Sequence, residues 1–193
     1  GVIRGACSRH HDVEGPAIYA LRVIRTGSTT PPSLAPTIGL PYITNRINCG
    51  GPTITDSDGH TWVSDAQFTP GGSTVQPSLY IPVNYVLTPD TQPYADIFQT
   101  ERYTSKSIGN LIYNIPVDSN GVYEVEFVFG ETWHQLAGTR GFNVLVQGEP
   151  AFVALDIVVE GGFQRPLLKT ATATVQGEEM ITITFVPLAS AKE

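Results

Sequence analysis

Apolar and polar residues alternate along most of this 193-residue chain with the period of a β-strand. Within residues 122–129, apolar side chains at the odd positions alternate with Glu124 and Glu126 at two even positions. Successive side chains of a strand point to opposite faces of its sheet. The segment therefore predicts a half-buried antiparallel strand whose two glutamates face solvent.

The same alternation occurs in three further segments, and turn residues separate them. The apolar faces are Leu111, Tyr113 and Ile115, then Phe142, Val144 and Val146, then Ile181, Ile183 and Phe185. The turns include Asp58-Gly59, Pro70-Gly71-Gly72, Asn120-Gly121, Gly161-Gly162 and Gln176-Gly177. We expect one short helical turn, near residues 95–100. The pattern predicts an all-β protein, an antiparallel β-sandwich of the jelly-roll type.

The opening segment differs from these strands because it is apolar on both faces. Ile18, Ala20 and Ile24 occupy one face, and Tyr19, Leu21 and Val23 occupy the other. Such a segment is typical of a strand covered on both sides. It is followed by a stretch dense in Ser, Thr and Pro, which predicts an extended linker. The chain thus divides into a strand segment (1–25), a linker (26–41) and a sandwich (42–193).

Composition narrows the class of protein. Only 15% of the residues are charged, against about 25% in average soluble domains, and the net charge is -7. The three lysines, Lys106, Lys169 and Lys192, form no cluster, which argues against nucleic-acid binding. No apolar run approaches the ~20 residues that span a bilayer, so no membrane insertion is expected. This composition is typical of extracellular β proteins. Because the chain begins at Gly1, we interpret it as a piece of a longer precursor.

Seven short motifs follow one another in a fixed order between residues 42 and 187. They are Ile47-Asn48-Cys49-Gly50-Gly51, Asp56-Ser57-Asp58-Gly59, Phe98-Gln99-Thr100-Glu101-Arg102-Tyr103, Phe129-Gly130-Glu131-Thr132-Trp133, the run 141–148, Leu155-Asp156-Ile157 and Ile183-Thr184-Phe185-Val186-Pro187. This set resembles the malectin and malectin-like family, whose members are β-sandwiches of the carbohydrate-binding kind. The run from Gly15 to Val23 resembles that family's last strand, whose usual place follows Val186. The terminal strand is thus displaced to the N-terminus and supplied by residues 14–25.

The resemblance also implies where a sugar would bind. Malectin holds its ligand with aromatic side chains on loops at one end of the sandwich, together with an acidic group. The matching positions here are Phe68, Tyr103, Trp133, His134, Glu14 and its neighbour Asp12. His134 replaces an aromatic residue, and Phe68 replaces a ring that bears a hydroxyl. Structural roles are open as alternatives to sugar binding. Trp133 can be a core or interface aromatic, and Arg102 can pair with Glu101 or Glu131.

A sandwich that lacks its last strand would leave a long edge with unpaired backbone groups, which proteins normally cover. The opening segment can fill that slot in its own domain, or enter a neighbouring copy as a donor strand through Ile18, Tyr19, Leu21 and Val23. The chain can also be one repeat of a tandem array, cut out of phase. We expect a fibrous, strand-exchanged assembly of copies, with closure in cis as the alternative. The family's first and last strands lie close together, so the resemblance also suggests a Cys7–Cys49 disulfide.

Other chemistry finds little support in the sequence. No nucleophile lies in an elbow motif and no histidine has an identifiable catalytic partner, so the chain is not expected to be an enzyme. Asp56-Ser57-Asp58-Gly59 lacks the remaining ligands of a calcium loop and predicts an Asx-stabilised turn. His10-His11-Asp12 is a poor metal site because adjacent strand residues diverge, and no metal or cofactor is expected.

The chain has no Asn-x-Ser/Thr sequon, so any glycan it carries would be O-linked. The linker offers Ser28, Thr29, Thr30 and Ser33 as sites for such modification. Taken together, the sequence predicts a non-catalytic extracellular module of the malectin-like kind, one subunit or repeat of a larger assembly, with carbohydrate and copies of itself as partners. The alternative is a lectin-type module closed by its own N-terminal strand.

Overall fold

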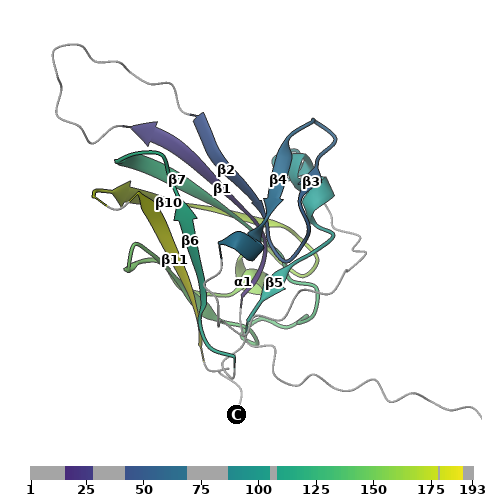
Figure 1. The fold of residues 1–193 in the computed structure, drawn as a ribbon. Helices are drawn as coiled ribbons and strands as arrows, with labels where there is room; N and C mark the ends of the chain where they lie inside the picture. Colours follow the sequence, from purple (N-terminus) through teal and green to yellow (C-terminus); the bar gives the residue numbers. More distant parts are fainter. Residues whose placement is uncertain (1–15, 28–41, 69–86, 105–107, 178, 189–193) are drawn as a thin grey trace, which may run out of the picture.

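The computed structural model describes residues 16–27, 42–68, 87–104, 108–177 and 179–188. Two β-sheets pack face to face and make up nearly the whole fold (Figure 1). The strands are β1 (Ala17–Gly27), β2 (Tyr42–Asn48), β3 (Ile54–Thr55), β4 (Thr61–Ser64), β5 (Arg102–Tyr103), β6 (Leu111–Pro116), β7 (Gly121–Phe129), β8 (Phe142–Val146), β9 (Glu149–Leu155), β10 (Leu167–Val175) and β11 (Met180–Pro187). The predicted all-β sandwich is therefore confirmed.

The larger sheet has the strand order β10-β7-β1-β2-β4-β3, with β5 paired to β1 at one end. The smaller sheet has the order β6-β11-β8-β9. Helical structure is limited to short pieces: η1 (Asp65–Gln67), η2 (Gln92–Ile97) and α1 (Ile157–Glu160). Each alternating segment of the sequence lies in a strand, and the helical turn expected near residues 95–100 is η2, which begins three residues earlier.

The displaced segment forms β1, a central strand of the larger sheet. It pairs antiparallel with β2 on one side and with β7 on the other. Ile18, Tyr19, Leu21 and Val23 are all fully buried. The segment that we expected to enter a neighbouring copy fills the slot in its own sandwich instead, so the alternative of closure in cis describes this structure. Thr26 and Gly27, which the sequence assigned to the linker, are the last residues of β1. The rest of the predicted linker, with its four hydroxyl residues, lies outside the described residues.

The main core lies between the two sheets and is rich in aromatic rings. Phe185 from the smaller sheet meets Phe127 and Phe129 of β7 edge-on, at centroid distances of 6.2 and 6.3 Å. Edge-to-face pairs of this kind match the positive edge of one ring to the negative face of another. The apolar alternation predicted from the sequence therefore supplies the inner faces of both sheets.

A second apolar cluster covers the outer face of the larger sheet. It contains Tyr19, Ala20, Trp62, Tyr94, Ile97, Phe98 and Val128. The segment that carries η2 supplies three of these residues and lies over β1 and β7. This second layer explains why β1 is apolar on both faces.

The same layer corrects one expectation for β7. Glu126 was expected to face solvent, but it is only 7% exposed. Its carboxylate accepts a hydrogen bond of 3.0 Å from Nε of Arg22 on β1. The Arg22 guanidinium lies 5.8 Å from the centre of the Tyr94 ring. The prediction was wrong because the η2 segment covers a face that strand alternation alone assigns to solvent.

Candidate ligand-binding site

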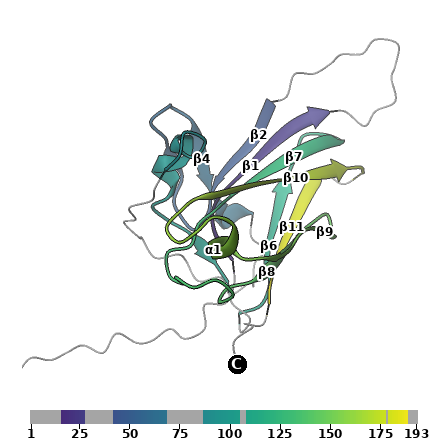
Figure 2. The same cartoon turned by 180° about the vertical axis from the view of Figure 1, so that it is seen from behind.

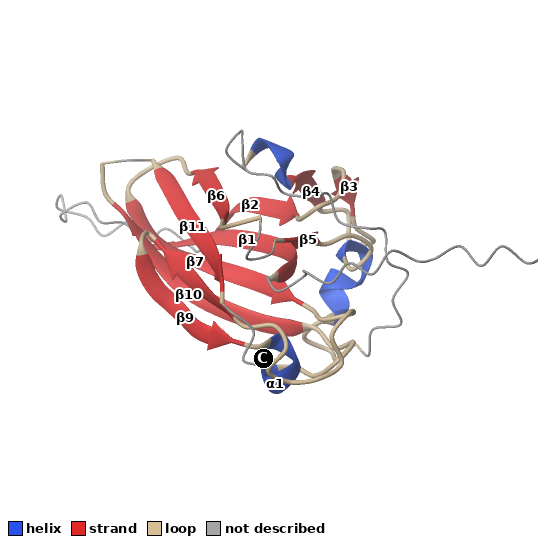
Figure 3. Cartoon of the chain, turned by 90° about the horizontal axis from the view of Figure 1, so that it is seen from below, coloured by secondary structure: helices blue, strands red, loops and turns tan. Residues whose placement is uncertain are grey.

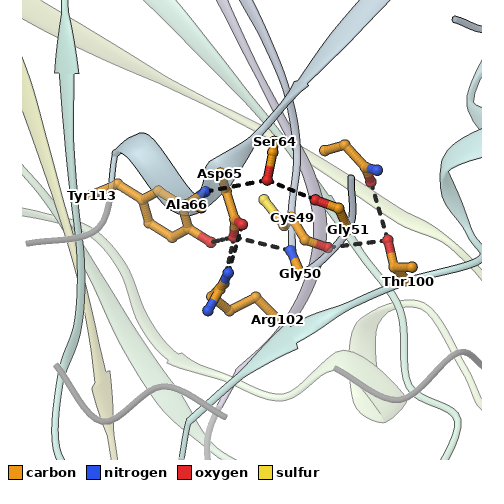
Figure 4. Close-up of polar contacts among 10 residues, drawn as sticks. Cys49, Gly50, Gly51, Ser64, Asp65, Ala66, Thr100, Arg102 and Tyr113 are labelled. Atoms are coloured by element: carbon orange, nitrogen blue, oxygen red, sulfur yellow. Dashed lines mark hydrogen bonds and ion pairs between the residues drawn. The ribbon is translucent and has the colours of Figure 1, made fainter. Parts of the chain in front are cut away.

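One buried carboxylate, Asp65, joins four parts of the sandwich (Figure 4). It is fully buried and accepts hydrogen bonds from Arg102 Nη2 at 2.6 Å and from the Tyr113 hydroxyl at 2.9 Å. The Arg102 Nε also donates to it, and the backbone N–H of Gly50 donates at 2.9 Å. We call these residues, with the adjacent Cys49, the Asp65 cluster. Arg102 therefore pairs with Asp65, and the expected pairing with Glu101 or Glu131 is wrong.

Two of the sequence motifs meet beside this cluster. The Thr100 hydroxyl donates to the Asn48 side-chain oxygen at 3.2 Å, which links the Phe98–Tyr103 motif to the Ile47–Gly51 motif (Figure 4). A Cβ atom on Gly51 would lie 2.3 Å from the Thr100 oxygen, closer than any side chain tolerates. The close approach of the two segments thus requires glycine at this position.

Burial and charge change the titration of the Asp65 cluster. Burial raises the pKa of the Cys49 thiol, and Asp65 raises it further. Burial likewise raises the pKa of the Tyr113 hydroxyl. Burial alone would lower the pKa of Arg102, but its hydrogen bonds to Asp65 raise it. Thiol and phenol stay neutral while one ion pair carries the charge, which is the arrangement of a structural polar core. Cys7 lies outside the described residues, so the proposed disulfide stays a prediction.

A second group of functional interest lies at one end of the sandwich. Ala17 at the start of β1 pairs with Tyr103, and Ile18 pairs with Phe129 at the end of β7. The loop that follows β7, residues 130–141, therefore leaves the sheet at the same end as Tyr103. We call this the loop end of the molecule.

Two carboxylates hold the loop end together. Oε1 of Glu131 accepts the backbone N–H groups of Trp133 at 2.6 Å and of His134 at 2.9 Å. Oδ2 of Asp156 accepts the N–H of Gly138 at 2.6 Å, while Oδ1 caps α1. The 130–141 loop is thereby tied to α1, which lies among the loops at this end (Figure 2).

Three large apolar side chains on these two loops are exposed. Trp133 is 56% exposed, Leu136 is 64% exposed and Val159 on α1 is 66% exposed. We call these three residues the loop-end apolar patch. A single exposed apolar residue is ordinary, but several on loops that are tied together make this end a candidate interaction site.

A buried group of charges lies beside the loop. Glu131 and Arg140 form an ion pair of 2.9 Å between Oε2 and Nη1, and both side chains are almost fully buried. Glu101 is also buried, and the Tyr19 side chain hydrogen-bonds to it. Burial raises the pKa of Glu101. The Tyr19 hydrogen bond and the charge of Arg140 offset part of this rise, and the charge of Glu131 adds to it. We call Glu101, Glu131 and Arg140 the Glu131 cluster. Among the described residues, Glu101 Oε2 and Arg140 Nε have no hydrogen-bond partner.

The residues predicted to bind sugar fall into three groups. Tyr103, Trp133 and His134 all lie at the loop end, and Trp133 is at the surface, so its interpretation as a core aromatic is wrong. Phe68 lies in the main core with 6% of its surface exposed, so its ring offers no face to a sugar and we assign it to the core. Glu14 and Asp12 lie outside the described residues.

Sequence reasoning missed several residues that organise this site. Asp65, Arg140, Leu136 and Val159 belong to no pattern that the sequence offered. Asp156 carried a usable signal, because an aspartate just before an apolar run is a common helix cap. The others act through partners far away in sequence, which a local pattern does not reveal.

The Asp56 turn is structural. Oδ1 of Asp56 accepts the N–H groups of Asp58 at 3.1 Å and of His60 at 2.7 Å, which confirms the predicted Asx turn. Oδ2 accepts the indole N–H of Trp62 at 2.8 Å. Burial alone would raise the pKa of Asp56, but the hydrogen bonds from Trp62 and His60 lower it.

Within the residues that the structure describes, no group of three or more His, Cys, Asp and Glu side chains is arranged to hold a metal ion. In the same part of the chain, no helix has the length and apolar character needed to cross a bilayer.

Comparison with solved structures finds the same fold in plant receptor ectodomains. The ANX1 ectodomain from Arabidopsis thaliana is 26% identical, with a TM-score of 0.62 over 74% of this chain and 42% of its own. The ANXUR2 extracellular domain from the same plant is 25% identical, with a TM-score of 0.63 over 77% and 44%. The ANXUR1 extracellular domain is 23% identical, with a TM-score of 0.66 over 93% and 50%. The chain therefore spans half or less of these ectodomains.

A search of curated proteins found no match to this chain. The family profile described as the Malectin domain matches residues 43–192, which is more than half of the chain and includes every motif that carried the resemblance. Like the ectodomains that share its fold, the chain is extracellular. It belongs to the malectin domain family.

Proposed function

We propose that this malectin domain is a non-catalytic recognition module that binds an extracellular polypeptide at its loop end. The observation that carries the proposal is the exposure of Trp133, at 56%, on a loop fixed by Glu131 and Asp156. An exposed aromatic on a loop that is already held in place can bury its ring against a partner with little ordering cost.

The kind of partner follows from the neighbours of Trp133. A sugar stacks on aromatic faces and needs polar groups for its hydroxyls. Leu136 and Val159 offer neither, yet they are the more exposed members of the loop-end apolar patch. Aliphatic side chains gain most by contact with other apolar side chains, which favours a polypeptide. The net charge of -7 favours a partner that carries positive charge.

One solved structure with this fold offers a parallel. A structure of the plant peptide RALF23 in complex with FER and LLG2 has a TM-score of 0.60 and 20% identity over 83% of this chain. At that identity the likeness concerns the fold alone. It supports the proposal only in so far as a receptor ectodomain with this fold occurs together with a peptide and a second protein.

A display experiment tests the proposal. A random peptide library on phage is panned against the chain, and the affinity of the enriched peptides is measured by calorimetry. Trp133→Ala and Leu136→Ser should each weaken binding about 10-fold or more, as expected for central interface residues. Met180→Ser is the matched control, because Met180 is also exposed, at 37%, but pairs with Pro116 at the other end of β11.

The selected peptides should contain apolar residues flanked by Lys or Arg. Equal binding by the wild type and Trp133→Ala, or a loss as large in Met180→Ser, would show that the loop end is not the site.

Carbohydrate is the second candidate ligand. Tyr103, Trp133 and His134 lie at the same end of the sandwich, where the family resemblance implies a sugar site. A glycan array probed with wild type and Trp133→Ala separates the two candidates. Specific glycan binding that Trp133→Ala abolishes, without enrichment of any peptide, would favour carbohydrate. We do not include strand exchange in the proposal, because β1 already lies between β2 and β7 of its own chain.

A further inference from the structure

Among the described residues, five strands have a neighbouring strand on one side only, and four of these, including the two-residue β5, are protected against pairing with another chain. β3 has only two residues. In β6, the N–H of Asn114 already donates to the Phe68 carbonyl at 2.8 Å, and the strand ends at Pro116. Short edges, prolines and covering segments are the usual means of blocking edge pairing.

The β9 edge is protected by irregularity. Its register against β8 shifts twice, and Pro150 occupies its second position. Ala154 has a φ of 50°, and its N–H donates to the Asn143 side chain at 2.8 Å. A bulged strand of this kind is a poor template for another strand.

The β10 edge is different. Its nine residues pair with β7 in continuous register without a shift, and its opposite edge pairs with no other strand among the described residues. β9 and β10 lie along the same side of the molecule, so the protected and the regular edge are neighbours (Figure 3). Thr170, Thr172 and Thr174 are exposed on its outer face, while Ala173 and Val175 are buried on its inner face.

The sequence of β10 is complementary to itself. An antiparallel pairing centred on Thr172 places Thr172 opposite Thr172 and Thr170 opposite Thr174 on the outer face. It places Ala171 opposite Ala173 on the inner face. Cross-strand Thr pairs stabilise antiparallel sheets, and no like charges face one another in this register.

The one charge on the strand is compatible with this pairing. Lys169 falls opposite Val175 of the other copy in this register. Its ammonium already binds Glu160 at 2.6 Å and lies 5.0 Å from the centre of the Phe152 ring on β9. Lys169 therefore links β10 to α1 and β9 of its own copy. The pairing of two β10 strands does not require the contacts with Glu160 and Phe152 to break.

We propose that the β10 edge is a docking surface for a second copy of this chain, joined by a two-fold axis at Thr172. The larger sheet of one copy and the larger sheet of the other then form one continuous sheet across the dimer. The pairing is centred on Thr172, whereas Trp133 and Leu136 belong to the loop that follows β7 and lie outside the paired strand. An isologous contact of this kind closes at two copies and builds no filament.

Sedimentation equilibrium of the full chain tests the dimer. The wild type should move from its monomer mass of 20.8 kDa towards twice that value as its concentration rises to about 1 mM, a range that reveals even weak contacts. Thr172→Lys places two ammonium groups opposite each other and should weaken the dimer about 10-fold or more. Val153→Lys is the matched control, because Val153 is 72% exposed on the neighbouring β9 edge.

A mixture of Thr172→Lys with Thr172→Glu fixes the register. Each variant alone should be monomeric, and the equimolar mixture should dimerise because opposite charges then face one another. Monomeric wild type at every concentration would overturn the proposal. The proposal would also be overturned if Thr172→Lys left the dimer unchanged, or if Val153→Lys weakened it equally. A mixture of the two Thr172 variants that dimerised no more than each variant alone would overturn it as well.

Discussion

The Asp65 cluster and the Glu131 cluster are both buried, but they differ in how completely their charges are paired. Asp65 receives four hydrogen bonds, two of them from Arg102. In the Glu131 cluster, two carboxylates face one arginine, and two buried atoms, Glu101 Oε2 and Arg140 Nε, lack hydrogen-bond partners among the described residues. Buried polar groups stabilise a fold only when their hydrogen bonds are complete.

This difference separates a structural region from one suited to function. The Asp65 cluster joins η1, β5, β6 and the segment that follows β2. The Glu131 cluster lies beside the exposed loop and holds Trp133 and His134 through the backbone. Buried polar groups whose hydrogen bonds are incomplete are less common in a purely structural core than at sites of binding. The comparison therefore supports the loop end as the site of binding.

The largest expected effect comes from the matched change of an acid to its amide in the two clusters. Asp65→Asn leaves the guanidinium of Arg102 buried without its counter-charge and should lower the free energy of unfolding by about 3–5 kcal/mol. Glu131→Gln should cost only about 1–2 kcal/mol, since its amide oxygen still accepts the loop N–H groups. Arg140 also keeps Glu101 as a counter-charge, and the repulsion between the two acids disappears.

Urea denaturation of both variants measures this difference. Circular dichroism of the native state controls for folding. An equal loss of unfolding free energy in Asp65→Asn and Glu131→Gln would contradict the difference that we infer between the two clusters.

A smaller effect concerns pH. Because burial raises the pKa of Glu101 above its ordinary value of 4.5, the folded chain holds this proton more tightly than the unfolded chain. The contribution of Glu101 to stability is therefore complete below pH 4.5 and is lost as pH rises through the folded pKa. It amounts to about 1.4 kcal/mol for each unit of the shift. Asp56 acts in the opposite sense, since its lowered pKa gives stability that is lost as pH falls.

Glu101→Gln isolates the contribution of Glu101, because the amide does not titrate. The unfolding free energy of wild type relative to this variant should rise as the pH is lowered from 7 to about 4.5. A difference that is independent of pH would show that the pKa of Glu101 is not shifted, and one that falls with acidification would show that it is lowered; either result would contradict the prediction.

Much of the fold could be predicted from the sequence. The alternating segments predicted β6, β7, β8 and β11, because inward-facing apolar residues mark a strand locally. The apolar character of both faces of the opening segment predicted a strand covered on both sides, and β1 confirms it. Such features depend on residues within one element, so a linear pattern contains them.

The rest depends on contacts between distant residues. Arg102 was paired with Glu101 or Glu131, two acids of the recognised motifs, whereas its partner, Asp65, lies outside those motifs and 37 positions away. Phe68 was assigned to a sugar site by its place in the family pattern, but it caps η1 and packs into the core. Glu126 was expected at the surface because alternation does not reveal the segment that covers it. Such placements require the three-dimensional structure.

The two tryptophans of the chain test the central claim directly. Trp62 is 3% exposed and donates its indole N–H to Asp56, whereas Trp133 is 56% exposed at the loop end. In nitrogen-15 NMR spectra each gives one indole signal, and Trp133→Phe assigns them. Titration with a display-selected peptide should shift the Trp133 signal and leave the Trp62 signal in place. A saturating peptide that shifts Trp62 alone, or neither signal, would contradict binding at the loop end.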